Sequence, residues 1–485
     1  MATRLFLNTI GLWMLALLLS TCTVGPDYVQ PSVEIPEKYK EAAEGWKVAQ
    51  PQDDHNRGDW WKVFNDPTLN TLEDQVKISN QNIATFEAQY RQARALVDQA
   101  RAGYAPTLTS SLSLTRQKPP HFIPTISVPP YTDHSMSLTA AWEPDLWGSV
   151  RRTVESSEAG AQASAAALAS AQLSAQASLA QYYFQLRALD ADQKLLDDLE
   201  GAYRKLLQLT QGRYGSGVAA QMDILQAQNQ LQSAQVQAVN NGIKRAQYEH
   251  AIAVLIGKPA SVFSLKPSPF IMTPPSIPVQ VPSVLLERRP DVAQAERQMA
   301  QANAQIGVAI AAFFPTLTLA ATGGFDYTSS TGLGQTGLGR WLSAPAQFWS
   351  LGPQLAAILF DGGLRDAKTA AARAAYDASV ASYRQTVLTA FQDVEDNLSS
   401  LRILASEAKV QDETVANTKR LLNLTINQYN AGTVAYADVI TAQTNAYMAQ
   451  KNAIDIASQH MTSAVGLIKA LGGGWDATSL KMPAK

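Results

Sequence analysis

One side chain of this sequence has a position that suggests covalent chemistry. Cys22 is the only cysteine of the 485 residues, and it follows a mostly apolar stretch from Leu5 to Leu19. That stretch has the length of the apolar part of a secretory signal peptide and is too short to span a bilayer comfortably. Leu19-Ser20-Thr21-Cys22 has the form of a lipobox, in which cleavage precedes the cysteine and the thiol receives a diacylglycerol. We therefore predict a lipoprotein signal peptide over residues 1–21 and lipidation of Cys22. The alternative is an ordinary secretory peptide with an incidental cysteine.

Two aspartates are singled out by an internal repeat. "LLQLTQGRYGSGVAAQMDILQAQNQLQSAQ" from Leu206 aligns without gaps with "LLNLTINQYNAGTVAYADVITAQTNAYMAQ" from Leu421. Asp223 and Asp438 occupy equivalent positions, each six residues after a glycine of the repeat. A carboxylate in the first turn of a helix is stabilised by the positive end of the helix dipole. A role at a helix start is therefore the simplest reading of both residues.

No other group of residues forms a pattern with catalytic chemistry. "GLGQTG" at Gly332–Gly337 matches a dinucleotide-loop pattern, but it lies between two expected strands and lacks the following helix that such a loop needs. The histidines show no metal-ligand spacing, and the net charge of −2 gives no basic surface for nucleic acid. We expect no enzyme activity, no cofactor, no metal and no nucleic-acid partner. The scattered histidines are His55, His121, His134, His250 and His460.

The elements that carry these residues occur twice. "QARALVDQARAGYAPTLT" from Gln92 resembles "QANAQIGVAIAAFFPTLT" from Gln301, so each half of the chain repeats one order of elements. Copies of roughly 200 residues are too long for solenoid repeats and indicate a duplicated domain. The predicted divisions are a signal peptide (1–21), an N-terminal anchor and extended segment (22–68), a first repeat (69–256), a Pro-rich segment (257–282), a second repeat (283–471) and a tail (472–485).

Each repeat is expected to contain a helix, a strand pair and a long helical hairpin. The first helices are predicted over 69–103 and 283–313, each ending before a proline. Very long helices are predicted over 149–214 and 361–428, with returning helices that end near Ile256 and Leu471. Gly217 and Gly432 are predicted to form the turns between them. The strands are predicted over 107–115, 135–142, 316–327 and about 349–359.

The strands alternate apolar side chains with Ser and Thr, which is typical of an outer-membrane β-barrel. An ordinary half-buried sheet would show the same alternation. One chain supplies only about four strands, whereas the smallest transmembrane barrels close with about eight. An open sheet edge is not tolerated in lipid, because its backbone groups would lack partners. If the strands enter a membrane, several chains must therefore share one barrel.

These features together resemble the TolC-like outer-membrane efflux proteins, and most closely the NodT-type lipoproteins of resistance-nodulation-division pumps. The resemblance covers nearly the whole mature chain. It rests on these segments: "CTVGPDYVQP" after the lipobox, "DWWKVFNDPTLNTL" at 59–72, "AAWEPDLWGSVRR", "ILFDGGLRDA", "LLERRPDVAQAE" at 285–296 and "LGGGW" at 471–475.

The resemblance implies a mainly α-helical fold with a small β part. Three chains would share a twelve-stranded β-barrel and a periplasmic α-barrel made of the helical hairpins, and the Pro-rich segment would join an equatorial girdle. Asp438 would stand at the pore constriction, and Asp223 would belong to a hydrogen-bond network between helices at the gate. Thr441 and Val434 depart from the family pattern of a second constriction aspartate and a gate-bridging arginine. The tip loops expected to contact the periplasmic adaptor are Gly217-Val218-Ala219 and Gly432-Thr433-Val434.

The function implied is the exit duct of a tripartite efflux system that passes small molecules such as drugs. The expected location is the outer membrane, with a lipid anchor at Cys22, and the expected partners are two further copies of the chain, a periplasmic adaptor and an inner-membrane pump. A duct for type I protein secretion is the nearest alternative. A non-channel helical scaffold in the periplasm is a second alternative, and it gives no reason for duplicated amphipathic strand pairs.

Overall fold

The computed structural model describes residues 24–33, 35, 36, 38–41, 59–118, 130–270, 275, 288–330, 342 and 344–475. The predicted signal peptide and Cys22 lie outside the described residues, as do "GLGQTG" and most of the C-terminal tail. In chain order the elements are η1 (Trp60–Phe64), α2 (Pro67–Ser79), α3 (Gln81–Ala102), β1 (Thr107–Gln117), β2 (Tyr131–Trp142), α4 (Ser149–Gly215), α5 (Gln221–Leu255), η2 (Ala260–Val262), α7 (Pro290–Ala311), β3 (Thr316–Ser330), η3 (Ala344–Ala346), β4 (Gln347–Ala356), α9 (Leu364–Asn430) and α10 (Tyr436–Ala470).

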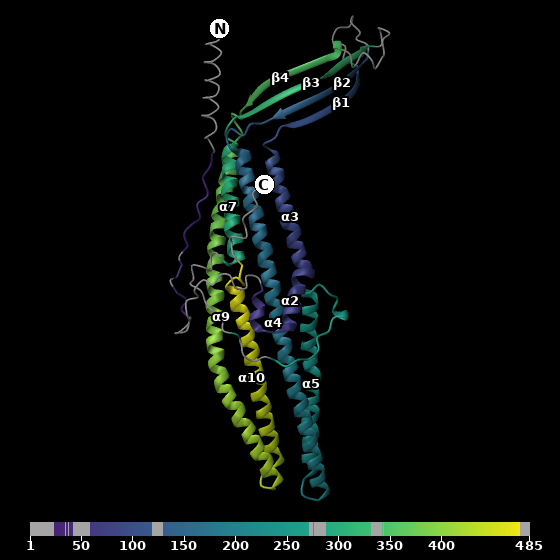
Figure 1. The fold of residues 1–485 in the computed structure, drawn as a ribbon, viewed down its shortest axis with the longest axis vertical. Helices are drawn as coiled ribbons and strands as arrows, with labels where there is room; N and C mark the ends of the chain where they lie inside the picture. Colours follow the sequence, from purple (N-terminus) through teal and green to yellow (C-terminus); the bar gives the residue numbers. More distant parts are fainter. Residues whose placement is uncertain are drawn as a thin grey trace. The chain divides into compact units, whose positions relative to one another are not determined.

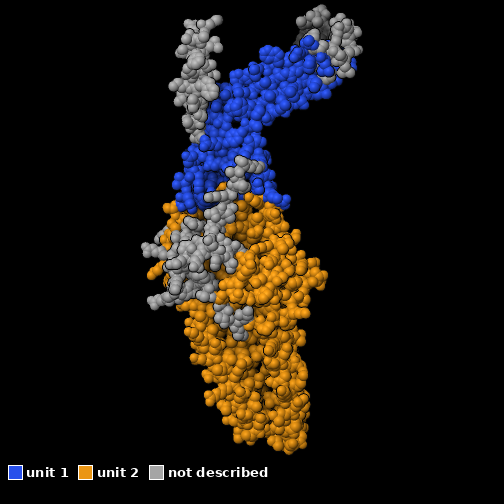
Figure 2. Space-filling view, in the orientation of Figure 1, with its two compact units in different colours: residues 1–31, 91–161, 296–381 blue, residues 32–90, 162–295, 382–485 orange. Residues whose placement is uncertain are grey.

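The chain folds into two compact units, which Figure 2 distinguishes by colour. Unit 1 contains residues 1–31, 91–161 and 296–381, and unit 2 contains residues 32–90, 162–295 and 382–485. Each unit takes segments from both sequence repeats, because the strand pairs of the two repeats belong to unit 1 and both returning helices belong to unit 2. The two compact units therefore do not test the predicted boundaries of the sequence repeats at residues 69, 257, 283 and 472, which stay a prediction.

Unit 1 is built around one antiparallel sheet in the order β1-β2-β3-β4. β1 and β4 are its outer strands, as Figure 1 shows. β4 was expected to continue to Leu359 but ends at Ala356, because Ala356 pairs with Thr316, the first residue of β3. Residues beyond Ala356 have no strand residue left to pair with.

The register of the sheet gives it one apolar and one polar face. Leu112 pairs with Met136, which pairs with Phe325, so these side chains share a face. On the opposite face hydroxyls meet across strands, with 2.8 Å between Ser111 Oγ and Ser137 Oγ. The predicted alternation is thus present across the sheet. The apolar face also carries Leu108, Leu114, Leu138, Trp142, Leu319, Trp349, Leu351 and Leu355, all of them exposed in the single chain.

Long helical hairpins make up most of unit 2, as expected from the unbroken Ala- and Leu-rich runs. α4 and α9 each contain 67 residues, and α5 and α10, which return from them, each contain 35. Small side chains let the helices approach closely, and Ala166, Ala177 and Ala180 of α4 are at most 1% exposed. Among the described residues, no helix combines the length and the apolar character required to cross a membrane.

The prediction of one helix over 69–103 is wrong, because the structure has two helices there, α2 and α3, which are separated at Asn80. The Asn80 side-chain oxygen accepts hydrogen bonds from the backbone N–H groups of Asn82 and Ile83, which caps α3. Its amide group donates to the carbonyl oxygen of Leu255 at 2.8 Å. The break thus depends on the end of α5, 175 residues away. α7 begins at Pro290, a residue suited to the first turn of a helix, and residues 281–287 lie outside the described part.

Candidate functional site

The tips of the two helical hairpins have the same local structure. Gly217 and Gly432 adopt positive φ angles of 74° and 78°, which only glycine adopts without strain. The Val218 N–H donates to the carbonyl of Arg213 at 2.9 Å, and the Thr433 N–H donates to that of Gln428 at 3.0 Å. These bonds close α4 and α9 in the manner of a Schellman motif. The predicted turn glycines are therefore confirmed, and the tip residues are exposed or half-buried.

Asp223 and Asp438 act as helix-start carboxylates in the single chain. Each is the third residue of its helix, and its Oδ2 accepts the backbone N–H of the residue before the helix, Ala220 or Ala435, at 3.0 Å. This bond satisfies a donor that the helix leaves unpaired. Asp438 is exposed and Asp223 is half-buried. The assignment of Asp438 to a pore constriction and of Asp223 to a gate network stays a prediction.

The two tips are bridged by Arg213, a residue that the sequence analysis missed. Its Nη1 donates to the carbonyl oxygen of Tyr429 at 2.7 Å, and its guanidinium lies 4.5 Å from the centroid of the Tyr429 ring. Tyr429 in turn lies 5.9 Å from the ring of Tyr436. These two tyrosines pack with Ala227 of α5 and Val439 of α10 in one buried cluster. The bridge ties the end of α4 to the end of α9.

The tip of the second hairpin thus has Val434 in place of an arginine. The bridging arginine of this chain, Arg213, lies on the first hairpin. The repeat itself carries the signal, because Arg213 aligns with Gln428 and only the first copy has a cation there. Tyr436 is 3% exposed, and among the described residues its hydroxyl has no hydrogen-bond partner. Burial raises the pKa of Tyr436, with smaller contributions from Tyr429, Tyr203 and Asp223. The tip therefore keeps an uncharged phenol in its packed centre.

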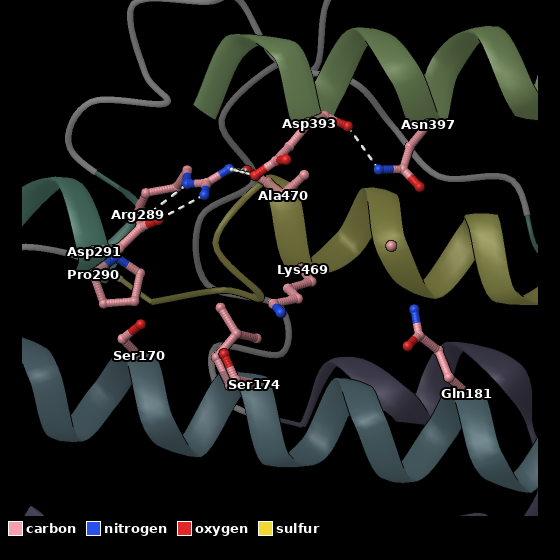
Figure 3. Close-up of a pocket in the computed structure, with 12 residues that line it drawn as sticks. Ser170, Ser174, Gln181, Arg289, Pro290, Asp291, Asp393, Asn397, Lys469 and Ala470 are labelled. Atoms are coloured by element: carbon pink, nitrogen blue, oxygen red, sulfur yellow. Dashed lines mark hydrogen bonds and ion pairs between the residues drawn. The ribbon is translucent and has the colours of Figure 1, made fainter. Parts of the chain in front are cut away.

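In the described part of the motif at 285–296, the Arg289 guanidinium is held by several acceptors. The guanidinium donates to Asp291, at 2.6 Å from Nη2, and to Asp393 of α9, at 3.0 Å from Nη1. It also reaches the carbonyl oxygen of Ala470 at the end of α10. Burial opposes ionisation of Asp291, but the Arg289 guanidinium holds its pKa below the usual value. Figure 3 shows these contacts beside a polar cavity of about 320 Å³ that Lys469 also lines.

The segment after the predicted lipidation site lies along unit 1. We call residues 24–28 the N-terminal strap. The Val24 N–H donates to the carbonyl oxygen of Trp147 at 3.3 Å, and Arg152 donates to Asp27 at 2.8 Å. Gly25 has a φ of +97°, and a Cβ there would meet the Cα of Gly307 at 2.5 Å. A glycine is therefore required where the strap crosses α7. Further bonds join Tyr28 to Glu296 and Asn303 to Pro26.

The Trp-Trp motif at 59–72 serves packing in unit 2. Trp61 is fully buried and Trp60 is 7% exposed. Asp66 caps α2 by accepting the backbone N–H groups of Thr68 and Leu69, and it also accepts the Tyr183 hydroxyl of α4. The motif thus attaches α2 to α4.

No group of three or more His, Cys, Asp and Glu side chains within the described residues could hold a metal ion. His55 and His121 lie outside those residues.

Comparisons with known proteins agree with this architecture. The sequence model described as "Outer membrane efflux protein" matches residues 72–258 and 281–473. The pyoverdine export outer membrane protein OpmQ of Pseudomonas aeruginosa is 29% identical over 481 residues, which are 97% of this chain and 98% of OpmQ. The solvent efflux pump outer membrane protein SrpC of Pseudomonas putida is 29% identical over 475 residues, covering 95% of this chain and 97% of SrpC.

A solved structure shares the fold over nearly the full length. The outer-membrane channel OprN superposes with a TM-score of 0.83 at 29% identity, covering 94% of this chain and all of the OprN chain. The family match covers most of the residues, and both the sequence relatives and this structure agree with it. The chain belongs to the outer membrane efflux protein family and is the outer-membrane exit duct of an efflux system.

Proposed function

We propose that the duct is a homotrimer that takes small molecules from a periplasmic adaptor and an inner-membrane pump through a gate at the hairpin tips. The observation that carries this proposal is the four-stranded sheet, which has one apolar face, one Ser- and Thr-rich face and two outer strands. In lipid the backbone groups of both edges must be paired. Three copies joined edge to edge would close such a sheet into a barrel with its apolar face toward lipid.

The tips are the proposed adaptor-binding and gating region. Gly217-Val218-Ala219 and Gly432-Thr433-Val434 are short, and their glycines are exposed at the ends of long helices. Three copies of Asp438 around one axis would concentrate negative charge, which favours cations and disfavours anions. Asp223 and the Arg213–Tyr429 bridge would hold neighbouring helices together in the closed state. Opening would require the adaptor to offset these contacts.

Lipidation at Cys22 would anchor the duct beside its own sheet. The strap begins two residues after Cys22, and its Val24 is bonded to Trp147, between β2 and α4. A lipid attached at Cys22 would then enter the same membrane as the strands. Thr23 follows the cysteine, where an aspartate signals retention at the inner membrane in some bacteria, so the outer membrane is the expected destination.

The proposed cargo is a small organic molecule. The two relatives named above carry different cargo in their names, pyoverdine in one and solvent in the other. Because the chain is equally identical to the two relatives, we assign it the class of cargo that they share, a small organic molecule, and neither pyoverdine nor solvent in particular. Type I protein secretion remains the second candidate. Deletion of the gene separates the two candidates, because loss of an efflux duct should cause a small-molecule dye to accumulate in the cell, whereas loss of a secretion duct should abolish export of a secreted protein.

The mass of the detergent-extracted full chain tests the trimer directly. Native mass measurement and cross-linking should both plateau at three copies, and reconstituted protein should conduct ions across planar bilayers. A stable monomer that keeps its strand content would contradict the shared barrel, because an open four-stranded sheet would then persist without edge partners.

A further inference from the structure

One contact within unit 1 joins the two repeats. The Trp147 ring, between β2 and α4, stacks on Phe314 with 4.8 Å between ring centroids and an angle of 23°. Its Nε1 donates to the carbonyl oxygen of Pro315 at 2.7 Å. In each repeat, we call the segment that leads from the strand pair to the long helix the passage. We call the segment that leads from the preceding helix into the strand pair the corner. The passage of the first repeat thus packs on the corner of the second repeat.

Among the described residues, the remaining passage and corner make no such ring stack with each other, although Trp142 Nε1 of β2 donates to the Tyr104 carbonyl oxygen of the first corner at 3.0 Å. The corner of the first repeat, Gly103–Pro106, aligns with residues 312–315, and all four of its residues are exposed. The passage of the second repeat contains Ile358, Leu359 and Phe360, which are 61%, 94% and 88% exposed. Three consecutive exposed apolar residues in an ordered passage form a surface that normally has a partner.

Both of these segments adjoin the outer strands of the sheet. The first corner leads directly into β1 and the second passage directly follows β4, whereas the stacked pair lies at the central β2–β3 junction (Figure 1). When one surface of a chain binds a different surface of the next copy, the copies join head to tail, and they form a ring if the rotation between neighbours closes. A neighbouring copy that pairs its β1 with β4 brings its own first corner to the second passage.

The sizes of the side chains are complementary. The alignment that matches Pro106 with Pro315 also places Ala105 opposite Phe314. The first corner therefore offers space where the second corner holds a ring, and the second passage presents the exposed apolar pair Leu359 and Phe360 to fill it. Phe360 has no N–H to replace the Trp147 indole donor, so this contact would be apolar throughout.

We propose that Leu359 and Phe360 of one copy pack on Ala105 and Pro106 of the next copy, repeating between chains the joint that Trp147 makes within the chain. The inference rests on the proposed trimer and assigns the residues that close it at the junction of strands and helices. The occupant is a second copy of this chain, and lipid covering the segment is the competing outcome of the test.

A cysteine pair tests the contact in the full chain. Leu359→Cys together with Ala105→Cys should give cross-linked dimers and trimers under mild oxidation. Leu359→Cys with Leu114→Cys is the matched control, because Leu114 is also exposed but lies seven residues after the start of β1, roughly 23 Å along the strand. Each single variant controls for linkage through Cys22.

The native mass of the same samples distinguishes the outcomes. A trimer whose first pair links no better than the control pair would overturn this contact, point to lipid on the passage and leave the proposed duct intact. A sample that never forms a trimer would overturn the contact together with the proposed homotrimer.

A side-chain exchange gives a second measurement that does not depend on cysteine geometry. Phe360→Ala should raise the dissociation constant of the assembly at least about tenfold, because it empties a packed interface site. Ala105→Phe added to Phe360→Ala should restore much of that loss by refilling the joint from the other side. Strictly additive losses in the two variants would contradict direct contact.

Discussion

At the tip of the second hairpin, Asp438 has a structural role that one substitution can separate from its proposed role in the gate. Its carboxylate accepts the Ala435 N–H at 3.0 Å and so caps α10. Asp438→Asn keeps an oxygen for this bond and removes the charge. We expect Asp438→Asn to weaken the cation preference of the conductance while leaving the assembly intact, because only the charge ring is changed.

The controls for Asp438 use the same measurement in planar bilayers. Asp438→Ala removes both the charge and the cap, so it should lose selectivity and also about 1 kcal/mol of stability. Asp412→Asn makes the same charge change at an exposed position of α9, 18 residues from the end of that helix. Unchanged ion preference in Asp438→Asn, with lowered stability in Asp438→Ala, would reduce Asp438 to a cap.

Glu73 makes stability depend on pH. It is fully buried, and within the described part of the chain neither carboxylate oxygen has a hydrogen-bond partner. Burial raises its pKa from 4.5 to about 9, while the nearby Lys77 lowers it and Asp74 raises it. Between these pKa values the folded chain keeps a proton that the unfolded chain releases, so stability falls as pH rises from about 4.5 to about 9.

Glu73→Gln should therefore stabilise the protein above pH 5, since the amide needs no proton to stay neutral. At pH 7 the gain should be on the order of 3 kcal/mol, and the decline of the melting temperature toward pH 9 should flatten. Glu87→Gln is the control on an exposed position of α3 and should change little. Parallel pH profiles for wild type and Glu73→Gln would mean that Glu73 is ionised in the folded protein.

On the scale of elements, the Arg213–Tyr429 bridge holds the α4 and α9 ends together. It combines a 2.7 Å hydrogen bond from a charged donor with a cation–π contact at 4.5 Å. Arg213→Gln installs the residue found at the equivalent position of the second repeat. We expect it to raise the ratio of open to closed channel about tenfold, equivalent to the loss of about 1.4 kcal/mol.

The matched control is Arg204→Gln, which makes the same charge change on α4 at an exposed residue whose ion pair, with Glu200 one turn away, lies within the same helix. It should leave the open probability of single channels at the wild-type value. Equal effects of Arg213→Gln and Arg204→Gln would assign the change to net charge and remove Arg213 from the latch.

For the whole molecule, membrane attachment is predicted from two features of unit 1: the apolar face of the sheet and the strap that follows Cys22. Radiolabelled lipid should be incorporated into the wild-type chain and not into Cys22→Ser. Cys22→Ser should still reach the outer membrane if it is cleaved, because the strands remain able to insert. Label in neither form would mean that Thr21 prevents lipidation and that the strands alone hold the duct.

The amino-acid sequence by itself determined the elements whose signals are local. Gly217 and Gly432 mark the turns because a positive φ is easy only for glycine. Alternation of Leu with Ser and Thr marks the strands, and the repeat marks the duplication and the two equivalent aspartates. Each of these signals is contained in a few neighbouring residues or in a comparison of the chain with itself.

Only the tertiary structure decided the contacts between segments far apart in the chain. Asn80 ends α2 because its side chain reaches Leu255, 175 residues away, and Arg213 bridges the tips by bonding to Tyr429, 216 residues away. Glu73 has an unremarkable place in a helical sequence and becomes a buried acid only where α2 packs. Hydrogen bonds and burial act over a few ångströms, so they exist only after folding has brought such residues together.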